Sequence, residues 1–262
     1  MTARLILSWR KYRFLLFELI KRDFKVKYKR SALGMLWSLL YPVLMMCVMA
    51  LVFRNVFRFS APGVSYLSYL MIGLTLFNYY SEASNLSMSS VVANFSLLNK
   101  VYLPKYIFPL SKCLFVGINF LLTLLPLYAV ILLTGTGLCW QHLLLPYDYL
   151  CLLLFTLGMG LALSAAAVLL RDLFYIYGII LTIWTYLTPI MYDLNSIGSP
   201  RLIALMKLNP LYHFISYART IMLFHRTPGP GQFAACALSG VLALLIGASF
   251  FRSRQDTFIY YC

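Results

Sequence analysis

The sequence predicts an all-α integral membrane protein with six transmembrane helices. Six runs of at least 20 residues contain no charged side chain, and about 20 helical residues cross the hydrocarbon core of a bilayer. The 262 residues are 62% hydrophobic and 11% charged, which is more apolar than the roughly 45–50% of an average soluble domain. A block of basic residues precedes the first run, and such blocks stay in the cytoplasm.

The uncharged runs also predict how the chain is oriented in the membrane. The expected spans lie near residues 33–54, 65–92, 106–134, 147–169, 174–192 and 232–251. Six crossings place both termini on one side. If that side is cytoplasmic, sixteen Lys and Arg residues lie inside and six lie outside. The positive-inside rule therefore favours cytoplasmic N- and C-termini.

Residues 1–32 differ in kind from the spans and are expected to be a cytoplasmic segment. Lys21–Arg30 contains six Lys or Arg residues and a single acid, Asp23. Apolar residues recur among the cations at about helical spacing; they are Phe14, Phe17, Leu19, Ile20 and Phe24. This pattern predicts an amphipathic helix at the inner membrane surface. The pattern alone leaves two roles open: a lipid-binding flank and a docking helix for a cytoplasmic partner.

The connections between the spans are mostly short. A polar break at residues 94–105 and a tight turn at Arg171-Asp172 are expected on the cytoplasmic side. The longer external connection, residues 193–231, holds two expected short amphipathic helices separated by Asn209-Pro210. Irregular backbone at membrane depth must stay wet or pack in protein, so we expect these helices to dip back into the outer leaflet as a gate. Residues 33–252 then form one transmembrane domain, and residues 253–262 form a short cytoplasmic tail.

The chain has few groups that could perform chemistry. It contains no GxxxxGK[ST], HExxH or GxSxG motif, so it has no sequence signature for nucleotide binding, metalloprotease or hydrolase activity. Its seven acids are far apart and its six cysteines form no CxxC pair. We therefore expect no catalytic, metal or cofactor site on this chain. Any work that the protein does would then draw its energy from a gradient or from a separate subunit. The net charge of +15 does not imply nucleic acid, because the cations flank apolar spans and suit anionic lipid.

Aromatic residues are dense on two of the expected spans. The second span carries Tyr66, Tyr69, Phe77, Tyr79 and Tyr80, and the fifth carries Trp184, Tyr186 and Tyr192. One interpretation is a belt at the water–lipid boundary. The other is a lining for a pathway, because Tyr and Trp combine a flat apolar face with a hydrogen-bonding tip, which suits sugar rings.

Two charged residues fall within expected spans. Glu82 lies in the second, and a carboxylate at membrane depth costs about 2.5–3.5 kcal/mol, so it should face protein, water or a cation. The alternative is that a long helix carries it near the inner headgroups. Lys112 lies about two turns into the third span and is expected to extend its ammonium to the interface.

Several segments resemble a known family. Lys21–Pro42, with Ser31, Leu33, Gly34, Trp37 and Pro42, resembles the entry to the membrane subunit of type-2 ABC exporters, which export O-antigen, capsular polysaccharide and teichoic acid. Further matches follow in the same order along nearly the whole chain: Asn99–Pro104, Arg171-Asp172, Thr188–Tyr192, Leu208–Leu211 and Asp256–Ile259.

The resemblance implies a homodimer in the bacterial plasma membrane, paired with two cytoplasmic ATPase subunits that carry the ATP and Mg. The N-terminal helix and the 94–105 loop would contact the ATPase, which favours the docking role. The coupling candidates are then Phe14, Phe17, Lys21, Asp23, Tyr28, Asn99, Lys100, Tyr102, Pro104, Arg171 and Asp172. Candidates for lining a glycan channel are Trp37, Tyr66, Tyr69, Phe77, Tyr80, Trp184, Tyr186 and Tyr192. Outer-gate candidates are Asn209, Pro210 and Arg219.

Three other functions remain open at this point. A type-2 permease for a drug or lipid would share the architecture, although the lack of a large extracellular domain favours the glycan exporters. A gradient-driven carrier would need internal repeats or several intramembrane carboxylates, and only Glu82 hints at one. A membrane-embedded transferase would need an acid, base or nucleophile; His142, His213 and His225 all lie in external segments.

Overall fold

The computed structural model describes residues 2–29, 33–56, 65–98, 103–194 and 197–260. Within these ranges the chain is helical and contains no strand. The α-helices are α1 (Thr2–Tyr28), α2 (Trp37–Val56), α3 (Tyr66–Ala93), α4 (Phe95–Leu98), α5 (Ile107–Leu133), α6 (Leu145–Leu169), α7 (Leu173–Leu187), α8 (Pro200–Lys207), α9 (Pro210–Met222) and α10 (Pro230–Arg254). Three short 3-10 helices accompany them: η1 (Gly34–Leu36), η2 (Trp140–Leu144) and η4 (Gln255–Tyr260).

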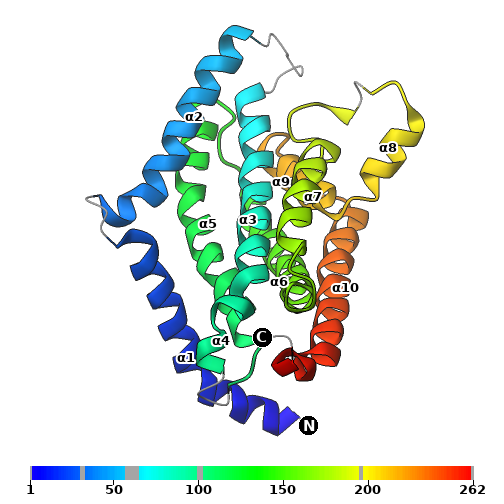
Figure 1. Ribbon diagram of the computed structural model, residues 1–262. Helices are drawn as coiled ribbons and strands as arrows, with labels where there is room; N and C mark the ends of the chain where they lie inside the picture. The colour runs from blue at the N-terminus through cyan, green and yellow to red at the C-terminus, as the bar shows by residue number, and fades with distance from the viewer. Residues whose placement is uncertain (1, 30–32, 57–64, 99–102, 195–196, 261–262) are drawn as a thin grey trace.

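The long helices form a bundle with different features at its two ends (Figure 1). Helices α2, α3, α5, α6, α7 and α10 lie alongside one another, with α3 in contact with α5 and α6 near the centre. Helix α1, α4 and η4 lie at one end, and α8 and α9 lie at the other. Helices are therefore present in the segment expected to be amphipathic and in both segments expected to hold short helices, and these segments lie at opposite ends of the bundle.

Among the residues that the structure describes, three helical segments are long and apolar enough to cross a membrane: Ile107–Leu133, Trp140–Leu169 and Pro230–Phe258. Helix α3 has 28 residues but is less apolar, because it carries serines on its packed face. Ser84, Ser87 and Ser90 recur every three residues and are buried. Their small size lets neighbouring helices approach closely: a Cβ on Gly160 of α6 would lie 2.8 Å from the Ser87 Cβ.

Helix α7 is shorter than the expected span at 174–192, and the prediction of its end was wrong. The helix has 15 residues and stops at Leu187. Pro189 explains the early end, since a proline disfavours helical backbone in the residue before it. Thr188 is accordingly extended, with φ −94° and ψ 127°. The chain then turns back over α3 rather than continuing as helix.

Helix α1 presents a different face to the bundle than its spacing suggested. Leu16, Leu19 and Ile20 are buried against the core, whereas Phe14 and Phe17 are 72% and 58% exposed. The five apolar residues expected to form one face therefore divide between two. One face packs on the bundle, and the other leaves the two phenylalanines largely exposed.

Candidate functional site

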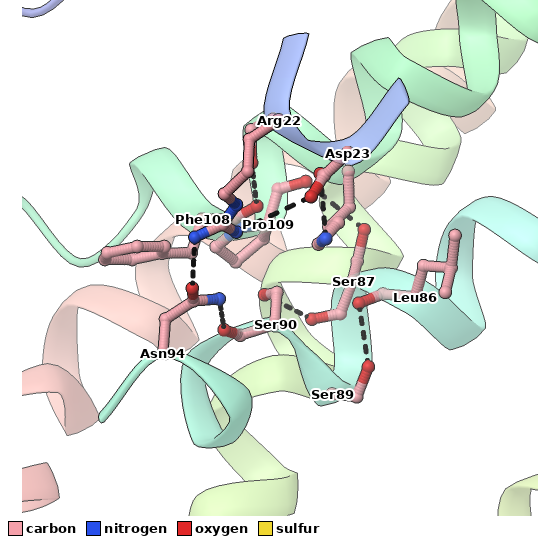
Figure 2. A network of polar contacts seen from close by, with 11 residues as sticks. Arg22, Asp23, Leu86, Ser87, Ser89, Ser90, Asn94, Phe108 and Pro109 are labelled. Atoms are coloured by element: carbon pink, nitrogen blue, oxygen red, sulfur yellow. Dashed lines mark hydrogen bonds and ion pairs between the residues drawn. The ribbon is translucent and has the colours of Figure 1, made fainter. Parts of the chain in front are cut away.

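A buried ion pair fastens α1 to the bundle (Figure 2). The Asp23 carboxylate lies 2.8 Å from the Lys112 ammonium on α5 and is 7% exposed. The neighbouring residue, Arg22, donates from Nη1 to Asn94 Oδ1 at 3.1 Å. Because Asn94 is the residue that ends α3, these contacts join α1 to both α3 and α5 at one point.

A chain of hydrogen bonds continues from that point along α3. Asn94 donates from Nδ2 to the Ser90 carbonyl at 2.8 Å, and the Ser90 hydroxyl donates to the Ser87 carbonyl at 2.6 Å. The Ser87 hydroxyl donates to the carbonyl of Pro109 on α5 at 3.2 Å. Each buried hydroxyl is thereby satisfied, and the C-terminal end of α3 is tied to the N-terminal end of α5 beside α1.

A second set of contacts holds the end of α1. Lys27 Nζ lies 2.9 Å from Glu82 Oε1 on α3. The Phe24 ring packs edge-on against Phe115 of α5, with centroids 4.7 Å apart. The Tyr28 hydroxyl donates to Asn119 Oδ1 at 3.5 Å. Helix α1 is therefore attached to α3 and α5 along its last two turns.

These contacts explain both charges that the sequence places inside spans. Glu82 faces a cation on α1, which suits a carboxylate within the span and equally one near the headgroups. The Lys112 ammonium pairs with Asp23 of α1, and its expected position at the membrane interface stays a prediction. In both pairs the partner comes from α1.

The other coupling candidates fall into three groups. Phe14, Phe17 and Lys21 lie on the exposed side of α1. Arg171 and Asp172 are exposed in the turn between α6 and α7, where the Asp172 carbonyl accepts from the amide of Tyr175 at 3.0 Å. Pro104 is half-buried just before α5, and its carbonyl accepts from the amide of Ile107 at 3.1 Å. Asn99, Lys100 and Tyr102 lie outside the described residues.

At the opposite end, Arg219 of α9 connects three segments. It is 6% exposed. Nη1 donates to the Pro189 carbonyl at 2.7 Å, and Nη2 donates to the Ile190 and Tyr69 carbonyls at 2.9 and 3.1 Å. The guanidinium carbon also lies 3.4 Å from the centroid of the Tyr69 ring. Burial lowers the pKa of Arg219 to about 10, so the side chain remains a cation at neutral pH.

Asn209 organises the start of α9. Its side-chain oxygen accepts from the amide of Leu211 at 3.0 Å, which caps the helix, and from Trp184 Nε1 at 2.8 Å. Its Nδ2 donates to the Thr188 hydroxyl at 2.7 Å. Pro210 occupies the first helical position, where its missing N–H costs nothing. Together Asn209 and Arg219 attach α9 to the turn that follows α7.

The structure brings most of the aromatic channel candidates to this region. The Tyr66 and Tyr69 hydroxyls donate to the carbonyls of Met191 and Tyr192, at 2.6 and 3.0 Å. Tyr80 packs edge-on against Trp184, with centroids 5.3 Å apart. The candidates in this group are Tyr66, Tyr69, Phe77, Tyr80, Trp184 and Tyr192, of which Phe77 and Tyr80 are buried within the protomer.

Two candidates lie away from this group. Tyr186 is exposed on the outer face of α7. Trp37 begins α2 and lines a cavity with Tyr28 and Glu82. The aromatic residues therefore do not form one continuous stripe on the single protomer.

Sequence reasoning missed several residues in these networks. Tyr177 is buried and donates to the Ser84 hydroxyl at 2.7 Å, joining α7 to α3. Thr188 and Asn119 are also buried and hydrogen-bonded to candidates. A polar residue within an apolar run was the available signal, since buried polar groups need partners. The partners themselves lie far away in the sequence, so no nearby residue indicates which they are.

Comparison with known proteins identifies the family. The family described as "ABC-2 type transporter" matches residues 15–223. The chain is 33% identical to the O-antigen export system permease protein RfbA of Myxococcus xanthus, over 97% of this chain and 98% of that protein. It is 26% identical to the RfbA permease of Klebsiella pneumoniae, over 93% of each chain. It is 21% identical to the polysialic acid transport protein KpsM of Escherichia coli, over 92% of this chain and 93% of that one. The chain belongs to the ABC-2 type transporter family, which confirms the resemblance seen in its sequence.

Proposed function

We propose that this chain is the permease subunit of an ATP-driven exporter that moves a lipid-linked cell-surface polysaccharide across the bacterial plasma membrane. Relatives named as O-antigen export permeases and a polysialic acid transport protein match it over almost their whole length. The chain itself carries no nucleotide-binding motif. Hydrolysis of ATP therefore falls to a separate cytoplasmic ATPase.

The observation that carries the proposal is the double attachment of α1. Asp23–Lys112 and Lys27–Glu82 connect α1 to the two helices at the centre of the bundle. The same helix leaves Phe14 and Phe17 exposed on its other side. A helix that is rigidly held on one side and apolar on the other suits transmission of force from a docked ATPase to α3 and α5. Phe14, Phe17 and Lys21 would contact that partner.

The proposed topology has six crossings with both termini in the cytoplasm. Helices α2, α3 and α7 join the three clearly apolar spans to make six, and the excess of cations at the α1 end favours that end as cytoplasmic. Helices α8 and α9 then form the external gate. Arg219 and Asn209 hold the gate to the turn after α7, so a movement of α3 or α7 would reach it directly.

The proposed path for the glycan runs along α3 and α7. Tyr66, Tyr69 and Trp184 gather near the gate, and their rings offer the flat apolar faces that sugars stack on. Helix α7 buries only Tyr177 and Leu181 in the protomer and leaves Ile179, Ile183 and Tyr186 exposed. We place this exposed face towards a second copy of the chain, which would complete the channel.

Co-purification tests the proposal. An ATPase carrying a nucleotide-binding P-loop should co-purify with the wild-type chain, and deletion of residues 4–30 should abolish the pairing. A double Phe14→Ala/Phe17→Ala variant should reduce recovery of the ATPase about tenfold, since exposed aromatic anchors dominate such interfaces. The matched control is Phe224→Ala, which removes an exposed phenylalanine at the opposite end. Undiminished recovery of the ATPase after deletion of α1 would contradict the docking role.

A further inference from the structure

A groove lies between α2, α3 and α5, close to the end of α1. One cavity of about 330 Å³ is lined by polar groups on all three helices, among them Tyr41, Asn78, Glu82, Asn119 and Thr123. A second cavity of about 330 Å³ shares four of these residues and extends to Lys27 and Trp37. The two cavities are therefore continuous, and we call them together the α2–α5 groove.

The groove contains a buried donor without an acceptor. Asn119 is 5% exposed, and its Oδ1 accepts from the Tyr28 hydroxyl. Its Nδ2 has no hydrogen-bond partner among the residues that the structure describes. An unsatisfied buried donor costs about 1–3 kcal/mol, so an acceptor from outside the chain is expected at this position.

The mouth of the groove carries one positive and one negative charge. Lys27 and Glu82 pair at 2.9 Å, and their side chains are 38% and 46% exposed. Both therefore remain accessible to a ligand, and their charges sum to zero. Trp37 and Tyr41 lie beside them with exposed rings, as aromatic residues do at the level of lipid headgroups.

Farther from Lys27 along α2 and α3, the lining of the groove is mostly apolar. Met45 and Met49 of α2 and Met71 of α3 line it. Methionine side chains are flexible and polarizable, and adapt to irregular apolar ligands. The groove thus has a charged mouth, a buried donor just inside it, and an apolar interior, which is the order of chemical groups along a phospholipid.

We propose that the α2–α5 groove binds a zwitterionic phospholipid of the phosphoethanolamine class. The phosphate would accept from Lys27 and Asn119 Nδ2, and the ammonium would pair with Glu82. An anionic headgroup would place its negative charge against the Glu82 carboxylate, so it is disfavoured. On the topology proposed above the lipid comes from the inner leaflet, but the binding chemistry is independent of that orientation.

Lipid retention by the full-length purified chain tests this proposal. The chain would be exchanged into an equal mixture of phosphatidylethanolamine and phosphatidylglycerol, and the bound lipids would be counted by native mass spectrometry. The wild type should retain phosphatidylethanolamine above its bulk share. Glu82→Gln should lower the ratio of phosphatidylethanolamine to phosphatidylglycerol about fivefold, the effect of one charge at a membrane surface. Glu18→Gln is the matched control, because Glu18 pairs with Lys21 on the exposed side of α1, and it should leave the ratio unchanged.

A second variant separates lipid binding from folding. Asn119→Leu removes the unpartnered donor and also the acceptor of the 3.5 Å bond from Tyr28, so it should lower retention of phosphatidylethanolamine while changing the melting temperature in detergent only slightly. Retention at the bulk ratio by the wild type would mean that water or bulk lipid fills the groove, and would overturn the proposal. The proposal would also be overturned if Glu82→Gln and Asn119→Leu both retained phosphatidylethanolamine at the wild-type level. Displacement of the lipid by a polyprenyl phosphate would overturn it too, by making the groove a substrate site, and would leave the proposed export function standing.

Discussion

Asp23 of α1 and Lys112 of α5 form an ion pair at 2.8 Å that is largely shielded from solvent. Neither charge is tolerable alone: Lys112 lies within an apolar helix, and Asp23 is the only acid among six cations at the end of α1. The ion pair compensates both buried charges and fixes the position of α1 along the bundle. The pair is therefore one of the points at which α1 is fixed to the helices of the bundle.

Breaking the Asp23–Lys112 ion pair should weaken the packing of α1 on the bundle. Asp23→Asn leaves the Lys112 ammonium unpaired, and removal of one partner of a buried pair costs about 3 kcal/mol or more. Asp23→Asn and Lys112→Gln should show a coupling energy in a double-mutant cycle measured by thermal unfolding. Glu18→Gln, which breaks an exposed pair, should cost less than about 1 kcal/mol. Additive effects of the two ion-pair substitutions would contradict the pairing.

Gly73 of α3 leaves space for Arg219. A Cβ there would lie 2.8 Å from Arg219 Nη2 and 3.1 Å from Ile190 Cγ2. Gly73→Ala should therefore displace the guanidinium and destabilise the protein by about 1–3 kcal/mol, as overpacking does. The control is Gly231→Ala in the first turn of α10, where no atom lies within 4 Å of the added Cβ. Equal melting temperatures for the two variants would argue against a packed gate.

Lysine should not replace arginine at position 219. Arg219 reaches the carbonyls of Tyr69, Pro189 and Ile190 at once, and the compact ammonium of lysine cannot reproduce this planar fork. We expect Arg219→Lys to lower the free energy of unfolding by about 3 kcal/mol and to reduce export. Arg226→Lys, at an exposed position beyond α9, should have little effect on either. Export at the wild-type level by Arg219→Lys would mean that the gate does not depend on these bonds.

Two substitutions of Tyr69 separate its ring from its hydroxyl. Tyr69→Phe loses only the hydrogen bond to the Tyr192 carbonyl, worth about 1 kcal/mol, and keeps the ring beneath Arg219. Tyr69→Ala removes that ring as well and should cut export much more strongly. Cell-surface glycan, normalised to the amount of folded permease, is the measurement. If export falls equally in both variants, the hydroxyl rather than the aromatic face is what matters.

The C-terminal tail should hold the segment that precedes α5. Phe258 of η4 is fully buried against Phe251, and Lys105 lies 5.3 Å from the centroid of its ring while donating to the Gln255 carbonyl. Phe258→Ala should cost about 3–5 kcal/mol and speed tryptic cleavage after Lys105. Phe250→Ala, at a more exposed site on α10, should not change the cleavage rate. Equal cleavage of the two would show that the tail does not restrain this segment.

The helices could be predicted because the information is local. Uncharged runs and helical spacing placed α3, α5, α6 and α10 within a few residues of their observed bounds. The end of α7 could also have been predicted, since Pro189 is visible in the sequence and restricts the residue before it. On α1, spacing identified Leu19 and Ile20 but not the buried Leu16, and it placed the exposed Phe14 and Phe17 on the same face.

The partners within the candidate site could not be predicted for a different reason. Lys27 and Glu82 are 55 residues apart, and no short pattern joins them. Arg219 binds backbone carbonyls. Every residue has a carbonyl, so the sequence does not indicate which residues accept these hydrogen bonds. Lone charges in apolar runs signalled that partners exist, and only the fold determined which residues supply them.

The most direct test of the account is transport by the purified components. The chain and its co-purifying ATPase would be reconstituted in proteoliposomes, and transfer of a lipid-linked oligosaccharide to the opposite leaflet would be followed with and without ATP. The account predicts transfer only when both proteins and hydrolysable ATP are present, and loss of transfer when α1 is deleted. Transfer by this chain alone, or transfer driven by a proton gradient in place of ATP, would contradict it.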